Sequence, residues 1–143
     1  MLALLPQLVH AALGQDTQSI AQERSRTQAR HKMLHRAGFA LHELHSEDGS
    51  RVRQFVSDRG RVFAVTWNAM HKPDLSTLLG AAYPAYSDEV QAAARRRGVQ
   101  HAVHHQSADL IVQSNGHLHI FTGYAYHPSM LPAGFDLAQL AKE

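Results

Sequence analysis

The chain has 143 residues, 44% of them hydrophobic and 18% charged, which suits a single globular domain. The net charge of +2 is too small to predict nucleic-acid binding, and we interpret the arginines at 95–97 as the end of a helix. There is no cysteine, which excludes thiol catalysis and thiolate metal sites.

The first eleven residues are apolar and uncharged, and they end in Val9, His10 and Ala11. This run is typical of the hydrophobic and cleavage regions of a secretory signal peptide, although no positive charge precedes it. It is much shorter than the roughly 20 residues that a membrane-spanning helix needs. We therefore interpret residues 1–11 as the remnant of a signal peptide and 12–143 as one exported, periplasmic domain. The alternative is a short buried helix.

A polar segment follows. Asp16 is a suitable N-cap, and residues 17–31 favour a helix. Ile20 is its only large apolar residue, so we expect this helix to dock loosely.

Residues 39–67 predict three antiparallel strands joined by two-residue turns at Asp48-Gly49 and Arg59-Gly60. Such turns would place Val52 opposite both His45 and Trp67. They would also pair Leu41 and Phe63 with Val56, and Gln54 with Val65. One face of the sheet would then carry Phe39, Leu41, Val52, Val56, Phe63, Val65 and Trp67. The run 62–65 is apolar on both faces, which indicates a central strand covered on both sides.

Two helices are predicted next. Asp74 can cap a short helix that stops at Gly80, and residues 84–97 predict a longer helix that stops at Gly98. The longer helix has a narrow apolar stripe suited to packing on a sheet, formed by Tyr86, Val90, Ala93 and Ala94.

Residues 101–126 predict a second set of three strands. Asn115-Gly116 is a strong two-residue turn signal, and Ser107-Ala108 is a weaker one. The predicted pairs are Ser114 with His117, Val112 with His119, Leu110 with Phe121, Val103 with Val112 and His105 with Leu110. Asp136 suits the start of a last short helix. The predicted fold is therefore α+β: an antiparallel sheet of two three-stranded meanders packed against helices.

Several stretches of the chain resemble a family of small exported bacterial proteins known as domain of unknown function 2844. The matching stretches are residues 53–67, 73–80, 109–126 and 128–135. The resemblance implies export and a single domain, but it implies no activity, cofactor or catalytic residue.

Histidine is unusually frequent, with 12 in 143 residues. On the predicted pairing, His117 and His119 point the same way from one strand and could chelate one ion, with His101 or an acid as a third ligand. Zinc or copper would be the metal. The alternative is that these histidines are the polar members of an alternating strand. Four tyrosines, at 83, 86, 124 and 126, either line a groove or pack at the edges of elements.

No catalytic motif is recognisable, so an enzyme is the least supported class. We predict a non-enzymatic exported protein that binds a partner protein or a small ligand in the cell envelope, without nucleic acid or a membrane span. A metal-binding envelope protein is the alternative. The open face of the sheet, near Phe55 and His42 or near His117 and Phe121, is the predicted place for binding. A ligand-binding protein should have an apolar-lined pocket between sheet and helix.

Overall fold

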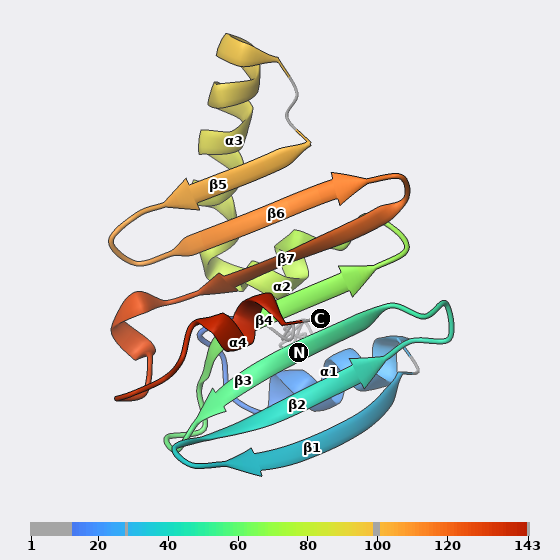
Figure 1. Cartoon of the computed structure of the whole chain (residues 1–143), viewed down its shortest axis with the longest axis vertical. Coiled ribbons are helices and arrows are strands. Elements are labelled where there is room, and N and C mark those ends of the chain that lie inside the picture. The colour runs from blue at the N-terminus through green and yellow to red at the C-terminus, as the bar shows by residue number, and fades with distance from the viewer. Residues whose placement is uncertain (1–12, 28, 99–100, 143) are drawn as a thin grey trace, which may run out of the picture.

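The structure, a computed structural model, describes residues 13–27, 29–98 and 101–142. In this part of the chain, seven strands form one antiparallel sheet in the order β1-β2-β3-β4-β7-β6-β5 (Figure 1). The strands are β1 (Arg30–Arg36), β2 (Phe39–His45), β3 (Arg51–Ser57), β4 (Val62–Ala69), β5 (Ala102–Gln106), β6 (Ile111–His117) and β7 (Ile120–Tyr126). The α+β class is as predicted. However, the sheet consists of a four-stranded and a three-stranded run, which join where β4 pairs with β7.

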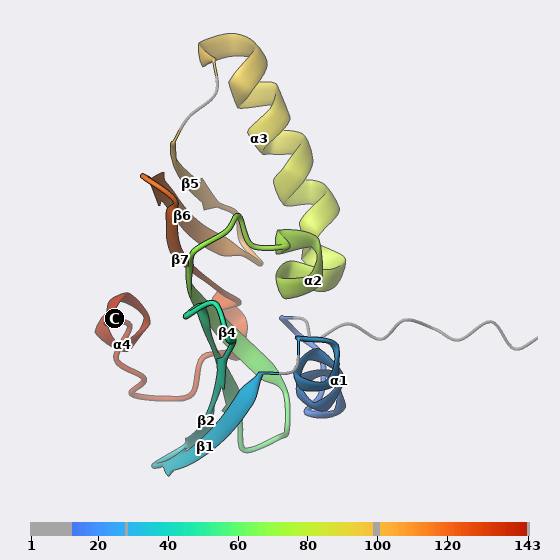
Figure 2. The same ribbon diagram turned by 90° about the vertical axis from the view of Figure 1, so that its right-hand side faces the viewer.

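Helices lie on both faces of the sheet (Figure 2). One face, here called the helical face, is covered by α1 (Gln18–Thr27), α2 (Leu75–Leu79), the 3-10 turn η1 (Gly80–Ala82) and α3 (Tyr83–Arg97). On the opposite face lies α4 (Ala138–Ala141), which follows the 3-10 turn η2 (Pro128–Met130). No helix among the described residues is long and apolar enough to cross a membrane. The predicted signal segment, residues 1–11, lies outside the described part of the chain.

The predicted helix boundaries in the middle of the chain are confirmed. The carboxylate of Asp74 accepts the backbone N–H of Thr77 at 3.3 Å and caps α2. Gly98 ends α3, and its N–H donates to the carbonyl of Ala94 at 2.8 Å. Asp136 accepts the N–H of Ala138 at 2.9 Å, at the start of α4.

The first predicted helix is too long. α1 ends at Thr27, and Arg30–Arg36 forms the strand β1, paired along its whole length with β2. A short polar helix gains little from packing, whereas pairing with β2 satisfies the backbone of this segment. The Arg and Lys residues of β1 suit an edge strand, because charge there discourages pairing with another chain.

The β2–β3 loop has three residues, not two. The N–H of Ser46 donates to the carbonyl of Ser50 at 2.9 Å, so Leu44, and not His45, lies opposite Val52. A shift of one residue exchanges the two faces of a strand. The predicted faces are therefore wrong for two residues of β2 that were placed beside Val52, namely Phe39 and Leu41.

The β3–β4 pairing is largely as predicted. Trp67 lies opposite Val52, but Val56 pairs with Val62 and not with Phe63. The register shifts beside Val56, at an irregularity that leaves Phe63 as the extra residue of β4. The predicted face is wrong for Phe63 too, because it packs with Phe39 and Leu41 on the face opposite to Val52.

The β6–β7 turn lies elsewhere than predicted. β6 continues through Asn115 and Gly116, and the turn is formed by Leu118 and His119, whose φ angles are 45° and 67°. The two strands therefore pair as Gly116 with Phe121, not as Ser114 with His117 or the other predicted pairs.

The β5–β6 pairing differs from the prediction by two residues. His105 lies opposite Val112, and Val103 lies opposite Ser114. Because side chains alternate with a period of two, this shift leaves these residues on the face where the sequence placed them.

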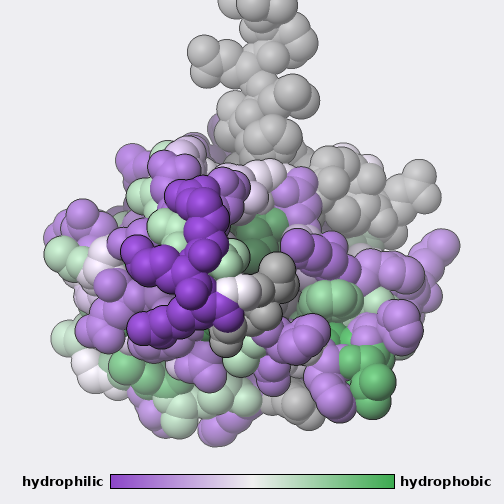
Figure 3. Space-filling model, turned by 90° about the horizontal axis from the view of Figure 1, so that it is seen from above, coloured by the Kyte–Doolittle hydropathy of each residue, from purple (hydrophilic) through white to green (hydrophobic). Residues whose placement is uncertain are grey.

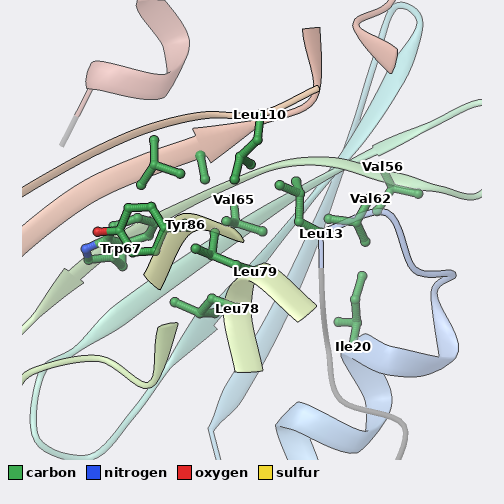
Figure 4. Packing of buried hydrophobic residues seen from close by; sticks show 12 residues of the cluster. Leu13, Ile20, Val56, Val62, Val65, Trp67, Leu78, Leu79, Tyr86 and Leu110 are labelled. Carbon is green, nitrogen blue, oxygen red and sulfur yellow. The ribbon is translucent and has the colours of Figure 1, made fainter. Parts of the chain in front are cut away.

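Most of the buried hydrophobic residues form two clusters, one on each face of the sheet. On the helical face they are Leu13, Ile20, Val56, Val62, Val65, Trp67, Leu78, Leu79, Tyr86, Leu110, Val112 and Ala125 (Figure 4). On the opposite face they are Phe39, Leu41, Phe55, Phe63, Ala64, Tyr126 and Leu140. Residues 62–65 of β4 are all 0% exposed, so this strand is central and covered on both sides, as predicted.

Candidate functional site

An open cavity of about 860 Å³ lies between α3 and the three-stranded half of the sheet. In Figure 2, α3 rises from α2 and its C-terminal end stands away from the sheet. The volume falls within the range of roughly 300–1,000 Å³ that is usual for small-molecule sites.

The helix wall of the cavity is formed by one stripe of α3. Val90, Ala93 and Ala94 of the predicted stripe border the cavity, together with Tyr83 and Tyr86 at the start of the helix. Tyr86 is only 5% exposed and belongs to the core, so it anchors the base of this wall. Burial, and to a lesser degree the neighbouring Tyr83, raises the pKa of Tyr86.

A buried contact holds the middle of α3 to the sheet. The ring of His105, which is 5% exposed, meets Tyr86 edge-on with centroids 5.7 Å apart. Glu89 Oε2 lies 2.5 Å from His105 Nδ1. The two atoms are close, but their geometry is not that of a hydrogen bond.

The sheet wall of the cavity is formed by residues of β5, β6 and β7 that the strand pairing places side by side. Val103 and Ser114 face each other on β5 and β6, and both border the cavity. The next row of the sheet pairs Phe121 with Gly116 on one side and with Ala69 on the other. Phe121 completes the apolar part of this wall.

Asn115 and Gly116 lie within β6 and form no turn. The N–H of Gly116 donates to the carbonyl of His101 at 2.9 Å, which joins the start of β5 to β6. A Cβ on Gly116 would lie 3.2 Å from the ring of Phe121, closer than an ordinary contact. The lack of a side chain at Gly116 leaves room for the aromatic ring of Phe121, its partner in the β6–β7 pairing. The turn lies further on, at Leu118 and His119.

Three histidines and a lysine gather at one end of the cavity, here called its mouth. His101, His117 and His119 all border it, as does Lys72 of the loop between β4 and α2. The pairing of the strands explains this gathering. The carbonyl of His101 accepts the N–H of Gly116, His117 follows Gly116 in β6, and His119 lies in the turn just before β7. Lys72 lies in the loop that follows Ala69, the last residue of β4 and the partner of Phe121 in the β4–β7 pairing.

The structure thus brings the three predicted metal ligands to one cavity, but not in the predicted geometry. His119 lies in the turn, so it does not project beside His117 from a strand. Within the described ranges, no group of three or more His, Asp or Glu side chains is arranged to hold a metal ion. A metal site at His101, His117 and His119 stays a prediction.

The other predicted binding place is wrong. Phe55 and His42 are 1% and 7% exposed, so neither lies on an open face. His42 instead stacks on His31 beneath α1, with Nδ1 of His42 2.9 Å from Nε2 of His31. The third and fourth tyrosines, Tyr124 and Tyr126, stack on each other at 6.3 Å and do not border the cavity.

Two residues of the mouth were not found from the sequence. Lys72 carries no signal beyond its place before Pro73, and Leu118 was expected within a strand. Leu118 is 79% exposed and has a positive φ, which is uncommon for a bulky residue. Seen from above, the surface is largely hydrophilic, with hydrophobic residues visible near its centre and at its lower right (Figure 3).

These features define a small α+β protein with one antiparallel sheet and an open cavity between a helix and that sheet. Residues 9–140 match the profile of a family described as Protein of unknown function (DUF2844). The chain belongs to this family, as its resemblance indicated. No curated protein and no solved structure matches it.

Proposed function

We propose that the protein is a non-enzymatic binding protein that holds a small ligand between α3 and the β5–β6–β7 part of the sheet. The observation that carries this proposal is the cavity of about 860 Å³. Its helix wall presents Tyr83, Val90 and Ala93, and its sheet wall presents Val103 and Phe121. Apolar walls with a few polar groups are usual for small-molecule sites.

The neutral fluorescent probe N-phenyl-1-naphthylamine tests this proposal, because its emission rises in an apolar site. We expect saturable binding by the wild-type protein. Ala93→Trp would fill the cavity from the helix wall and should weaken binding about tenfold or more. The matched control is Ala85→Trp, an exposed position of α3 that does not border the cavity. Saturable binding that both variants retain equally would overturn the proposal.

We also propose that the protein acts in the bacterial cell envelope after export. The apolar, uncharged residues 1–11 support this, as does the lack of cysteine. Removal of that segment would leave the described core complete. Leu13 is 2% exposed, and its N–H donates to the carbonyl of Leu78 at 3.0 Å. The next residue, Gly14, donates to the carbonyl of Val62 at 2.7 Å.

Export is tested by expressing the full-length gene product in a Gram-negative host and fractionating the cells. We expect a periplasmic protein whose mass corresponds to a start at Ala12. A protein that stays in the cytoplasm and keeps Met1 would overturn the proposal of export, but not that of the binding site.

A metal-binding protein is the second candidate, and the shared position of His101, His117 and His119 at the cavity mouth favours it. Titration calorimetry with zinc tests it. Binding should be lost in the double variant His117→Ala with His119→Ala and retained in His35→Ala, which alters an exposed histidine of β1. Zinc binding that is absent, or unchanged by the double variant, would exclude this candidate.

A further inference from the structure

The cavity is polarised in charge. Lys72, His101, His117 and His119 border it, and of the described residues around it only Asp74 carries a carboxylate. Asp74 accepts hydrogen bonds from Ser76 Oγ at 2.5 Å and from Thr77 Oγ1 at 2.7 Å, which hold its carboxylate at the start of α2. Its single negative charge is outnumbered by the basic groups around the cavity. Glu89 contacts the buried His105 and does not border the cavity. The charged and imidazole groups around the cavity are therefore mainly basic, and Arg97 and His104 border it as well. The neutral polar side chains of Ser87, Gln91 and Ser114 complete its polar lining.

The cavity is also polarised along its length. The histidines and the lysine of its mouth adjoin the row of the sheet that contains Phe121 and Gly116, at one end of the strands. Tyr86, Val90 and Val103 lie further inside, where α3 approaches β5. A ligand that fills the whole cavity would therefore contact apolar side chains in the interior and basic side chains at the mouth.

Resting on the proposed binding function, we propose that the ligand is an amphipathic anion. Its apolar chain lies between α3 and the sheet walls, and its single anionic group, a carboxylate or a phosphate monoester, lies at the mouth among Lys72, His101, His117 and His119. Imidazole N–H groups and an ammonium group donate hydrogen bonds to such oxygens. The exposed Leu118, in a turn with positive φ, borders the same mouth and covers the chain next to the anionic group.

Three probes with the same ten-carbon chain test the charge preference: decanoate, 1-decanol and decylamine, with the two ionic probes below their micelle-forming concentrations and the alcohol below its solubility. Decyl phosphate is added to distinguish the two anionic groups. Each probe is titrated against bound N-phenyl-1-naphthylamine at low ionic strength. We expect decanoate or decyl phosphate to bind about tenfold more tightly than decanol, and decylamine to bind most weakly. The preference should shrink in about 1 M salt, where the Debye length is about 3 Å.

A pair of double variants locates the effect. Lys72→Ala with His117→Ala removes one cation and one imidazole from the mouth, and should weaken binding of the anion about fivefold without changing that of decanol. Arg95→Ala with His35→Ala removes the same kinds of group from exposed positions away from the cavity, and should change neither. A melting curve for each variant shows that it is folded.

The outcomes separate the two proposals. Decanol binding as tightly as the anions, or equal effects of the two double variants, overturns the anionic ligand and leaves the binding cavity standing. If the neutral fluorescent probe and all four ten-carbon compounds fail to bind, both the binding cavity and the anionic ligand are overturned. A charge preference that only the mouth variant removes supports both.

Discussion

The indole ring of Trp67 lies against Gly123 on the neighbouring strand. A Cβ on Gly123 would come within 2.4 Å of the indole Cζ2, and equally close to the carbonyl oxygen of Gln113 on the other side. Trp67 and Gly123 are partners in the β4–β7 pairing, which joins the two runs of strands into one sheet. The absent side chain at position 123 therefore lets the largest side chain of the helical face pack directly on the backbone of β7.

Gly123→Ala should destabilise the protein by about 1–3 kcal/mol, because the added methyl group overpacks this contact. The cost is steric, since the backbone of Gly123 is outside the left-handed region that favours glycine. Urea unfolding measures it. The control is Thr122→Ala, a half-buried neighbour whose side chain points to the opposite face. Equal stability of Gly123→Ala and the wild type would show that the indole does not lie against β7.

Trp67→Ala should lower the free energy of unfolding by about 3–5 kcal/mol, as expected for a large core residue. Trp67 is 3% exposed, and its Nε1 has no hydrogen-bond partner among the described residues. Trp67→Phe keeps an aromatic ring and removes this unpaired group, so it should cost much less. A near-wild-type melting temperature for Trp67→Ala would contradict the packing.

Gln54→Met should stabilise the protein by about 1–3 kcal/mol. Gln54 is 0% exposed, and neither its Oε1 nor its Nε2 has a hydrogen-bond partner in the described structure. Methionine has a similar shape and removes the cost of burying an unpaired amide. The matched control is Gln106→Met at an exposed position of β5, which should be neutral. A loss of stability in Gln54→Met would mean that the amide is hydrogen-bonded in solution.

Stability should fall as the pH drops below about 6.5, the ordinary pKa of histidine. Burial beneath α1 lowers the pKa of His42, with smaller contributions from His31 and His35. Burial, and then Arg24 of α1, lowers the pKa of His31. A lowered pKa means that the unfolded chain binds more protons than the folded one between the folded and unfolded values. The stabilising effect is therefore complete above the unfolded pKa and is lost as the pH falls towards the folded one.

Urea midpoints at pH 7.5 and pH 5 test this dependence. His42→Phe should flatten it, because the variant keeps a planar ring under α1 but has no titrating group. The exposed His71, at 83% side-chain exposure, provides the control His71→Ala, which should keep the wild-type dependence. A His42→Phe variant with the full pH dependence would assign the effect to other groups.

The hairpins show how far the sequence predicted the fold. The strand segments of residues 39–67 and 101–126, the cap at Asp74 and the end of α3 at Gly98 all followed from local signals. The exact turns did not, because an Asp-Gly pair can lie in loops of different lengths and an Asn-Gly pair can also lie within a strand. In the β2–β3 loop the error was one residue and exchanged the faces of β2. In the β5–β6 loop it was two residues and left the faces unchanged.

The candidate site was predicted only in part. The apolar stripe of Tyr86, Val90, Ala93 and Ala94 follows from helical spacing, and it lines the cavity. The histidines were selected by their frequency, but their arrangement depended on the turn at Asn115 and Gly116. That turn is absent, since Asn115 and Gly116 pair with Thr122 and Phe121 within the sheet.

By itself, the sequence determined the α+β class, the burial of residues 62–65 and the positions of α2 and α3, because local spacing and capping decide these features. Only the tertiary structure decided that β1 is a strand, that β4 pairs with β7, and that Lys72 lies at one mouth with His101, His117 and His119. The physical reason is that each of these features depends on backbone hydrogen bonds or packing between segments far apart in the chain. Local propensity carries no information about such partners.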